Sequence, residues 1–237
     1  MRRIAALLLP LLATVATPAR AQEAVAYETV TEEVVVEEVV VGDAAPQGSE
    51  RFVVAAPAPV PAQVPQGIAR FGPFRVLDEG RAALVDETDS RGPAHFAAMV
   101  GAFPHIAVIE MVECPGTEDD RANLKLGRMI HARGIATHVP AGGSVRSGGV
   151  ELFLAGVRHT ADAGAEFAVH AWADEDGREP GDYAPDAPEN RAYLDYYREM
   201  GMSGEQARAF YAMTNSVPNA EAKWLTAADM GQWVSLN

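Results

Sequence analysis

The strongest constraint on the fold is an apolar strand that leads directly into an amphipathic helix. The run Ile106–Val112 is rich in β-branched residues, as is typical of a strand buried on both faces, and the loop after it contains Pro115-Gly116. Residues 119–133 then repeat apolar side chains at helical spacing. The apolar face consists of Ala122, Leu126, Met129 and Ile130. A strand, a loop and a helix in this order predict an α/β protein.

The same alternation continues along the chain from Phe71 onward. The sequence predicts strands at residues 74–77, 82–85, 106–112, 136–139 and 167–170. It predicts helices at residues 93–100, 119–133, 147–155 and 188–201 and after Ser203, and an acidic Pro/Gly loop at 174–189. Thr117 and Asp120 have capping-box spacing for the second helix, and Gly134 would end it. Residues 142–146 are expected to be a loop that enters the third helix.

Composition narrows the class of protein. The 237 residues are 48% hydrophobic and 22% charged, which excludes a wholly disordered or coiled-coil chain and leaves room for one globular domain, assigned to residues 67–237. The formal net charge of −14 has the wrong sign for a general nucleic-acid binder. The single Cys114 provides no internal disulfide. After the N-terminus, charge, Gly or Pro interrupts every apolar run, so no membrane span is expected.

The N-terminal residues have the pattern of an export signal. Arg2-Arg3 precede an apolar stretch, and Ala19-Arg20-Ala21 has the Ala-x-Ala form of a cleavage site, so residues 1–21 are predicted to be a signal peptide. Residues 22–66 are low in complexity, first Val/Glu-rich and then Ala/Pro-rich, and they predict a disordered linker. The expected location is therefore the periplasm, for a soluble exported protein.

Three small motifs lie where an α/β fold places function, at strand ends and helix starts. They are the Pro115-Gly116 loop, the helix start at Ser147-Gly148, and His170 at the end of a strand. A serine at a helix start has a hydroxyl beside unpaired backbone N–H groups, as an attacking nucleophile requires. The N–H groups of Gly116 and Gly148 would form an oxyanion hole, with His170 as the base. The alternatives are structural: a helix cap, a turn glycine and a hydrogen-bonded histidine.

The order of these motifs resembles the Clp protease proteolytic subunit and the wider crotonase-like superfamily. Ile109–Gly156 followed by Phe167–His170 resembles that family's strand with a Pro-Gly-Gly loop, helix, strand, nucleophilic Ser and later His. The helix after Ser147 ends in Ala-Gly, as in the family. The resemblance implies an α/β ClpP/crotonase-like fold of repeated ββα units. It also implies assembly into trimers or rings, which makes a homo-oligomer a candidate state.

The sequence also departs from that pattern. Thr117 replaces the second Gly of the loop, and its backbone should tolerate the turn only at negative φ. The family's third catalytic residue, an Asp, has no clean counterpart, which leaves Asn219 or Glu221 as candidates to orient His170. The Ser-Gly-Gly at 147–149 also looks like signal peptide peptidase A, which uses a Lys base. The only lysines, Lys125 and Lys223, match no dyad position.

Other chemical groups are interpreted as structural. Cys114 is expected to be a buried apolar residue, and the remaining histidines lack metal-ligand spacing, so neither a metal nor a cofactor is expected. The acidic loop has no calcium-loop spacing and is interpreted as a solvated flap beside His170. The aromatic residues are interpreted mainly as helix and core residues, with a peptide-binding wall as the alternative: Trp172, Tyr193, Tyr196, Tyr197, Phe210 and Tyr211.

The leading hypothesis is an exported, ATP-independent serine peptidase that acts through Ser147 and His170 on short or unfolded chains. No P-loop motif is present to power unfolding of a substrate. The alternative is a catalytically degenerate protein that keeps the fold and binds a peptide or protein through its backbone N–H groups. An acyl-CoA enzyme on the crotonase scaffold is disfavoured, because coenzyme A is not expected outside the cytoplasm.

Overall fold

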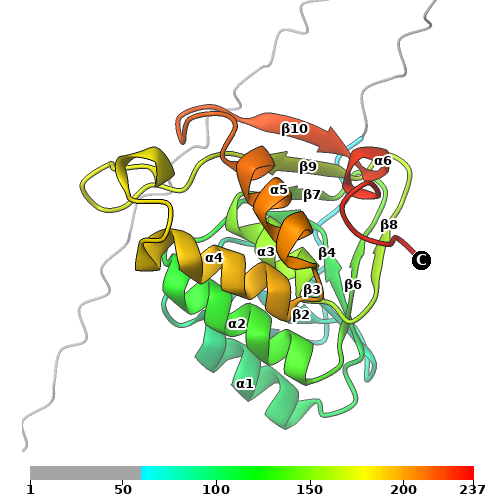
Figure 1. Cartoon of the computed structure of the whole chain (residues 1–237). Helices are drawn as coiled ribbons and strands as arrows, with labels where there is room; N and C mark the ends of the chain where they lie inside the picture. Colours follow the sequence, from blue (N-terminus) through cyan, green and yellow to red (C-terminus); the bar gives the residue numbers. More distant parts are fainter. Residues whose placement is uncertain (1–59) are drawn as a thin grey trace, which may run out of the picture. The chain divides into compact units, whose positions relative to one another are not determined.

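The computed structural model describes residues 60–237, in which ten strands form two mixed sheets (Figure 1). The first sheet has the order β1-β2-β3-β4-β6-β8, with β1 (Ala69–Phe71), β2 (Phe74–Val76), β3 (Arg81–Leu84), β4 (Val108–Met111), β6 (Ala136–Val139) and β8 (His159–Ala161). The second has the order β10-β9-β7-β5, with β5 (Glu113–Cys114), β7 (Ser144–Arg146), β9 (Glu166–Val169) and β10 (Lys223–Thr226).

The two sheets are built from a repeated ββα unit. In each unit, one strand joins the first sheet and the next strand joins the second, so β4, β6 and β8 are parallel neighbours, as are β5, β7 and β9. A helix follows the strand pairs β4–β5 and β6–β7. The predicted α/β fold of repeated ββα units is therefore confirmed. Because β5, β7 and β9 all run the same way, their carboxyl ends meet at one edge.

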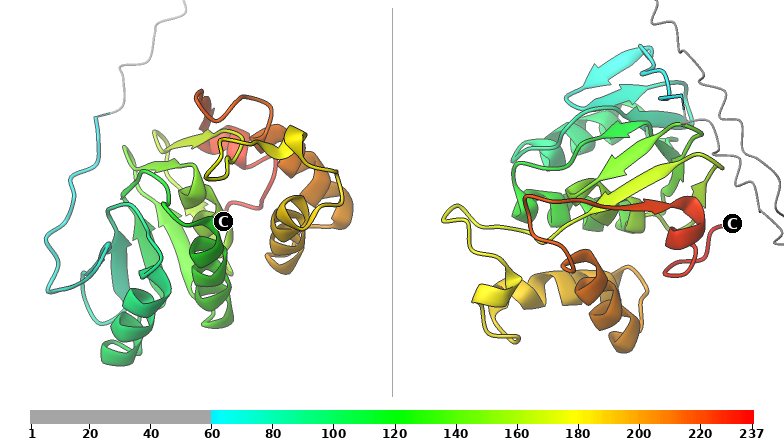
Figure 2. Two further views of the ribbon diagram at one scale, coloured as in Figure 1. Left: turned by 90° about the vertical axis from the view of Figure 1, so that its left-hand side faces the viewer. Right: turned by 90° about the horizontal axis from the view of Figure 1, so that it is seen from above.

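Helices cover the sheets in two layers (Figures 1 and 2). The helices are α1 (Gly92–Ala102), α2 (Asp120–Ala132), α3 (Gly148–Leu154), α4 (Pro188–Glu199), α5 (Gly204–Thr214), α6 (Ala227–Met230) and a 3-10 turn at Pro180–Asp182. Helices α1 to α3 pack side by side, and α4 packs on α2 and α5. Every residue of α3 is buried, so this short helix is the centre of the domain.

The core explains why the chain divides into these elements. Phe153 of α3 packs at 5.0 Å between ring centroids against Phe167 of β9, and Phe74 packs against Phe96 of α1. Alternate residues of β2 are fully buried, as expected for a strand with one face on the core. Burial of these large apolar side chains supplies the main stabilising free energy of a domain without a disulfide.

Two local predictions are wrong. The loop expected at residues 142–146 contains β7, whose three residues are too few to show strand periodicity in the sequence. The capping box expected from Thr117 and Asp120 does not form, because Asp119 is the N-cap and accepts the Ala122 N–H at 2.9 Å. The Thr117 hydroxyl instead donates to the Thr88 carbonyl at 3.2 Å, which fixes the loop before α2.

The predicted signal peptide and residues 22–59 of the predicted linker lie outside the described residues. Residues 60–66 contain no helix or strand, and Ala62 donates its N–H to the Gly142 carbonyl at 2.8 Å. Within residues 60–237, no helix is long and apolar enough to cross a membrane.

Candidate active site

Ser147 stands in a sharp turn between β7 and α3. Its φ of 49° and ψ of −129° make it the one non-glycine residue with positive φ in residues 60–237. Its N–H donates to the Ala168 carbonyl of β9 at 2.9 Å, and its side chain forms no helix-capping hydrogen bond. Such backbone strain is typical of functional sites, and a serine in a tight strand-to-helix turn is typical of hydrolase nucleophiles. The Ser147 hydroxyl therefore does not cap the helix, as it would if the role of this serine were purely structural.

Gly116 lies directly beside Ser147. Its φ is +140°, a conformation that favours glycine, and a Cβ added there would be 3.2 Å from the Ser147 Cβ and 3.5 Å from the Ser147 Oγ. Among the described residues, neither the Gly116 N–H nor the Gly148 N–H donates to a partner. The two predicted oxyanion donors are therefore free, and they belong to residues that adjoin Ser147 in space or in the chain. The φ of Thr117 is not positive, so the turn accommodates a threonine at the position of the family's second glycine.

A buried amide holds this arrangement together. Asn123 of α2, which is 2% exposed, donates its Nδ2 hydrogen to the Gly148 carbonyl at 2.7 Å and accepts from the Thr88 hydroxyl at 3.0 Å. The Thr88 N–H in turn donates to the Gly116 carbonyl at 3.1 Å. One side chain thus links the start of α3 to the Gly116 loop, and the positions of both predicted oxyanion donors depend on it.

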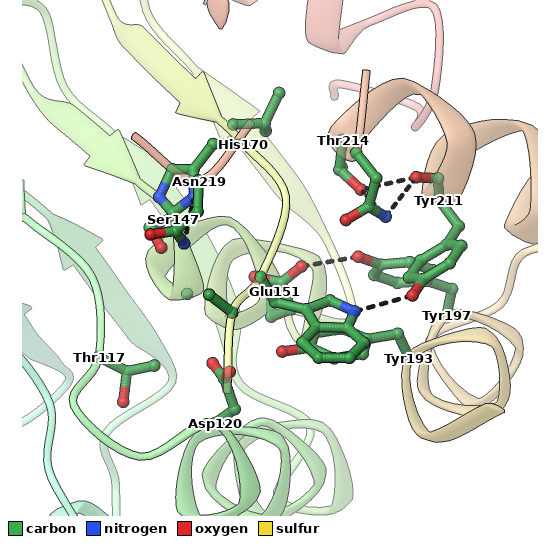
Figure 3. A pocket seen from close by; sticks show the side chains of 15 residues that line it. Thr117, Asp120, Ser147, Glu151, His170, Tyr193, Tyr197, Tyr211, Thr214 and Asn219 are labelled. Atoms are coloured by element: carbon green, nitrogen blue, oxygen red, sulfur yellow. Dashed lines mark hydrogen bonds between the residues drawn. The ribbon is translucent and has the colours of Figure 1, made fainter. Parts of the chain in front are cut away.

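His170 follows β9 and lies on the Ser147 side of the pocket (Figure 3). Its Nδ1 is 2.8 Å from the Ala171 carbonyl oxygen and 3.2 Å from Asn219 Nδ2, and Asn219 Nδ2 donates to the same carbonyl at 2.8 Å. A carbonyl oxygen only accepts hydrogen bonds, so this contact is satisfied when Nδ1 carries the proton. In that tautomer Nε2 has the free lone pair that a general base needs.

The two candidates for a third catalytic residue have different positions. Asn219 contacts His170, and Glu179 of the acidic loop fixes it by accepting its backbone N–H at 2.8 Å. Glu221 is exposed and is not among the residues that line the pocket. The structure therefore brings an amide and a backbone carbonyl, rather than a carboxylate, to His170 Nδ1.

A cavity of about 160 Å³ opens beside Ser147 and His170. Its far wall is aromatic and comes from the segment after β9 and from α4 and α5 (Figure 3). The aromatic lining residues are Trp172, Tyr193, Tyr197 and Tyr211. The interpretation of these four mainly as core residues is incomplete, because each also faces the cavity. Tyr197 is also fully buried in the core, as are Tyr196 and Phe210, but the latter two do not line the cavity.

Sequence reasoning missed two acids that line this cavity. Glu151 of α3 is 7% exposed, and burial raises the pKa of its carboxyl to about 7 although the Tyr197 hydroxyl donates to it at 2.7 Å. Asp120, the first residue of α2, is exposed at another part of the lining. A signal for Glu151 existed in the sequence: it is the one charge in the apolar stretch Val150–Leu154, four residues after Ser147.

The remaining candidates lie elsewhere. Burial raises the pKa of the Cys114 thiol, as expected for an apolar filler. No lysine lines the cavity, so neither Lys125 nor Lys223 is placed to act as a base for Ser147. No group of His, Cys, Asp and Glu in residues 60–237 has metal-site geometry.

Comparisons with known proteins concern the fold alone. No protein-family model matches the chain, and no curated protein matches its sequence. Solved structures with a similar fold include a mutant of ClpP1 from Listeria monocytogenes, with 16% identity and a TM-score of 0.44 over 66% of this chain and 88% of that one. Another is a mutant of the 1510-N membrane-bound stomatin-specific protease in complex with a substrate peptide, with 15% identity, a TM-score of 0.42 and coverage of 65% and 72%. An enoyl-CoA hydratase from Shewanella pealeana has 11% identity, a TM-score of 0.42 and coverage of 69% and 66%.

Proposed function

We propose that this protein is an ATP-independent serine hydrolase, and specifically a peptidase, with Ser147 as nucleophile. The observation that carries the proposal is the strained turn at Ser147, which leaves its hydroxyl uncapped beside two glycines whose backbone N–H groups are free. A helix cap would have no need of positive φ, because normal N-caps have extended backbone angles. The strain therefore supports a chemical role for this hydroxyl.

The proposed reaction is acyl transfer in two steps. His170 Nε2 takes the proton of the Ser147 hydroxyl while Oγ forms a bond to the substrate carbonyl carbon, and the oxyanion accepts from the N–H groups of Gly116 and Gly148. Collapse breaks the C–N bond, and the proton on His170 passes to the leaving amine. Water then gives a proton to His170 and attacks the acyl carbon, and the same proton returns to Ser147 as the acid product leaves.

Asn219 is a positioning residue in this proposal. It shares the Ala171 carbonyl with His170 Nδ1, and Ala171 is also held by its N–H donating to the Val217 carbonyl at 2.9 Å. These contacts fix the imidazole and its tautomer without adding a negative charge. An amide can orient a catalytic histidine in this way, as in the Cys-His-Asn proteases.

A fluorophosphonate probe tests the nucleophile directly. We expect one covalent adduct by intact mass on the mature protein, lost in Ser147→Ala and slower to form by about 10²-fold or more in His170→Ala, following the usual size of a general-base contribution. Ser203→Ala is the matched control, because Ser203 also precedes a helix but caps it. An adduct that persists in Ser147→Ala, or no adduct on the folded wild type, would overturn the proposal.

A second candidate function rests on the absence of a carboxylate at His170 Nδ1 within residues 60–237. A degenerate site would bind a peptide carbonyl or carboxylate through the Gly116 and Gly148 N–H groups without turnover. Peptide binding with no probe adduct, unchanged in a Ser147→Ala and His170→Ala double variant, would favour this candidate over the peptidase.

The proposed location is the periplasm, which rests on the N-terminal sequence alone. Cleavage after Ala21 would give a mature protein that begins at Gln22. N-terminal sequencing of protein recovered from the periplasmic fraction would test this, and a retained Met1 would contradict it.

A further inference from the structure

The cavity beside Ser147 contains a buried acid without a cationic partner. Glu151 is 7% exposed, and its Oε1 accepts the Tyr197 hydroxyl at 2.7 Å. Its other carboxylate oxygen has no hydrogen-bond partner among the described residues and is not sealed from the cavity. Figure 3 places this carboxylate between Ser147 and the aromatic wall. A buried charge of this kind is costly unless something pairs with it.

Within residues 60–237, no lysine or arginine of the cavity lining supplies the missing positive charge. The second acid of the lining, Asp120, adds negative charge to the same cavity. A glutamine at position 151 would fill the same volume and still accept from Tyr197. The acid therefore suits an occupant that brings a cation to the cavity.

The aromatic wall favours the same occupant. Trp172 and Tyr193 lie with their rings parallel within 6° and 6.1 Å apart, and the Trp172 indole N–H donates to the Tyr211 hydroxyl at 2.8 Å. The ring positions are therefore fixed before a ligand arrives. Aromatic faces carry negative charge density and attract cations, most strongly where water is excluded.

We propose that this cavity is the specificity pocket for a lysine side chain, the residue whose carbonyl carbon Ser147 attacks. This inference rests on the proposed peptidase function. Lysine fits better than arginine, because an ammonium is a compact point charge that one free carboxylate oxygen can pair. A guanidinium favours a bidentate contact with both oxygens, and Tyr197 already occupies Oε1.

Matched peptide substrates test the pocket. The substrates are fluorogenic amides that differ only before the scissile bond, with lysine, norleucine or arginine; norleucine has an apolar chain without the ammonium. We expect kcat/KM for the lysine substrate to be about tenfold or more above that for the norleucine substrate. The lysine substrate should also exceed the arginine substrate, but by a smaller factor. Glu151→Gln should remove most of the lysine preference, measured as the ratio of kcat/KM for the lysine substrate to kcat/KM for the norleucine substrate. The control is Glu205→Gln, which changes an exposed acid in the first turn of α5. It should change neither the kcat/KM for the lysine substrate nor that for the norleucine substrate.

A binding measurement separates this inference from the proposed function. n-Butylammonium should slow fluorophosphonate labelling of Ser147 in the wild type more than in Glu151→Gln, whereas neutral n-butanol should act equally on both. Labelling that succeeds without any lysine preference or ammonium effect would overturn the pocket assignment and leave the peptidase proposal intact. Absence of labelling would overturn the proposed function, and with it the substrate class.

Discussion

Two helices of this domain begin with the same dipeptide and use it in opposite ways. Before α5, Ser203 has φ −61° and ψ 160°, its hydroxyl accepts the Gln206 N–H at 3.2 Å, and the Gln206 side chain accepts the Ser203 N–H at 3.0 Å. Before α3, Ser147 has φ 49°, and its side chain makes no capping bond. A serine that stabilises its helix has relaxed backbone angles, whereas the uncapped serine occupies a strained turn beside a cavity.

The difference arises from what surrounds each dipeptide. The third residue after Ser203 is Gln206, which completes a capping box, whereas the third after Ser147 is Val150, which has no group to do so. Tertiary packing decides the rest. Ser147 is held by β9 through the Ala168 carbonyl and is adjacent to Gly116, whereas Ser203 is exposed. Parallel substitutions at the two helix starts test whether this difference has functional consequences.

The largest expected difference is in hydrolysis. Ser147→Ala should lower kcat/KM on the best peptide substrate by about 10³-fold or more, because the acyl-enzyme no longer forms. Ser203→Ala should leave kcat/KM unchanged. Both are measured with the same substrate on protein whose fold is checked by circular dichroism. Equal activity in the two variants would show that the strained turn has no catalytic meaning.

The glycines after the two serines provide the next contrast. A Cβ at Gly148 would lie 2.6 Å from Thr117 Cγ2 and 3.0 Å from Asn123 Nδ2, so Gly148→Ala must displace an oxyanion donor. We expect about 10²-fold lower kcat/KM, the usual result of a displacement near 1 Å. At Gly204, the nearest atom would be Arg198 Nε at 3.6 Å, an ordinary contact. Gly204→Ala should therefore keep full activity, and loss of activity in both variants would contradict this reasoning.

Glu151 in the first turn of α3 and Glu205 in the first turn of α5 should differ in their effect on the free energy of unfolding. Burial raises the pKa of Glu151 from 4.5 to about 7, so the folded state binds its proton more tightly than the unfolded state does. The charged form then costs the fold about 3 kcal/mol above pH 7, a cost that disappears as the pH falls from 7 to 4.5. Glu151→Gln should be more stable than wild type at pH 8, with a gap that closes by pH 4.5.

Urea denaturation at several pH values measures this gap. The carboxyl and phenol groups near Glu151 are Asp120, Tyr193, Tyr196 and Tyr197, and the three phenols stay protonated because burial raises their pKa values well above 10. Glu205→Gln in α5 should give the same free energy of unfolding as wild type at pH 8. A pH-independent effect of Glu151→Gln would show that its burial carries no protonation cost.

The smallest expected effects are on the helix starts themselves. Ser203→Ala removes a cap and should lower the free energy of unfolding by about 1 kcal/mol. Ser147→Gly should raise it by up to about 1 kcal/mol, because glycine adopts positive φ without strain. Urea denaturation of both variants at one pH gives the two signs, and a loss of stability in Ser147→Gly would contradict the strain assignment.

Much of the fold and part of the site could be predicted from the sequence. The strand around Ile106–Val112 and the amphipathic helix at residues 119–133 can be predicted because their hydrophobic periodicity is visible within a short stretch of sequence. The prediction was wrong at β7 because three residues carry no readable period. The sequence predicts Ser147, Gly116, Gly148 and His170 as site residues because α/β folds place functional groups at strand ends and helix starts.

Local sequence patterns predict the alternation of strands and helices and the positions of the proposed nucleophile, the proposed base and the two proposed glycine N–H donors. Only the tertiary structure decided that Ser147 is strained and uncapped, that Asn219 rather than Glu221 reaches His170, and that Glu151 lies unpaired in an aromatic cavity. The reason is the distance along the chain over which each property is determined. Periodicity and capping act within a few residues, whereas strain, contact and burial depend on elements that are distant in the chain, such as α3 and α4.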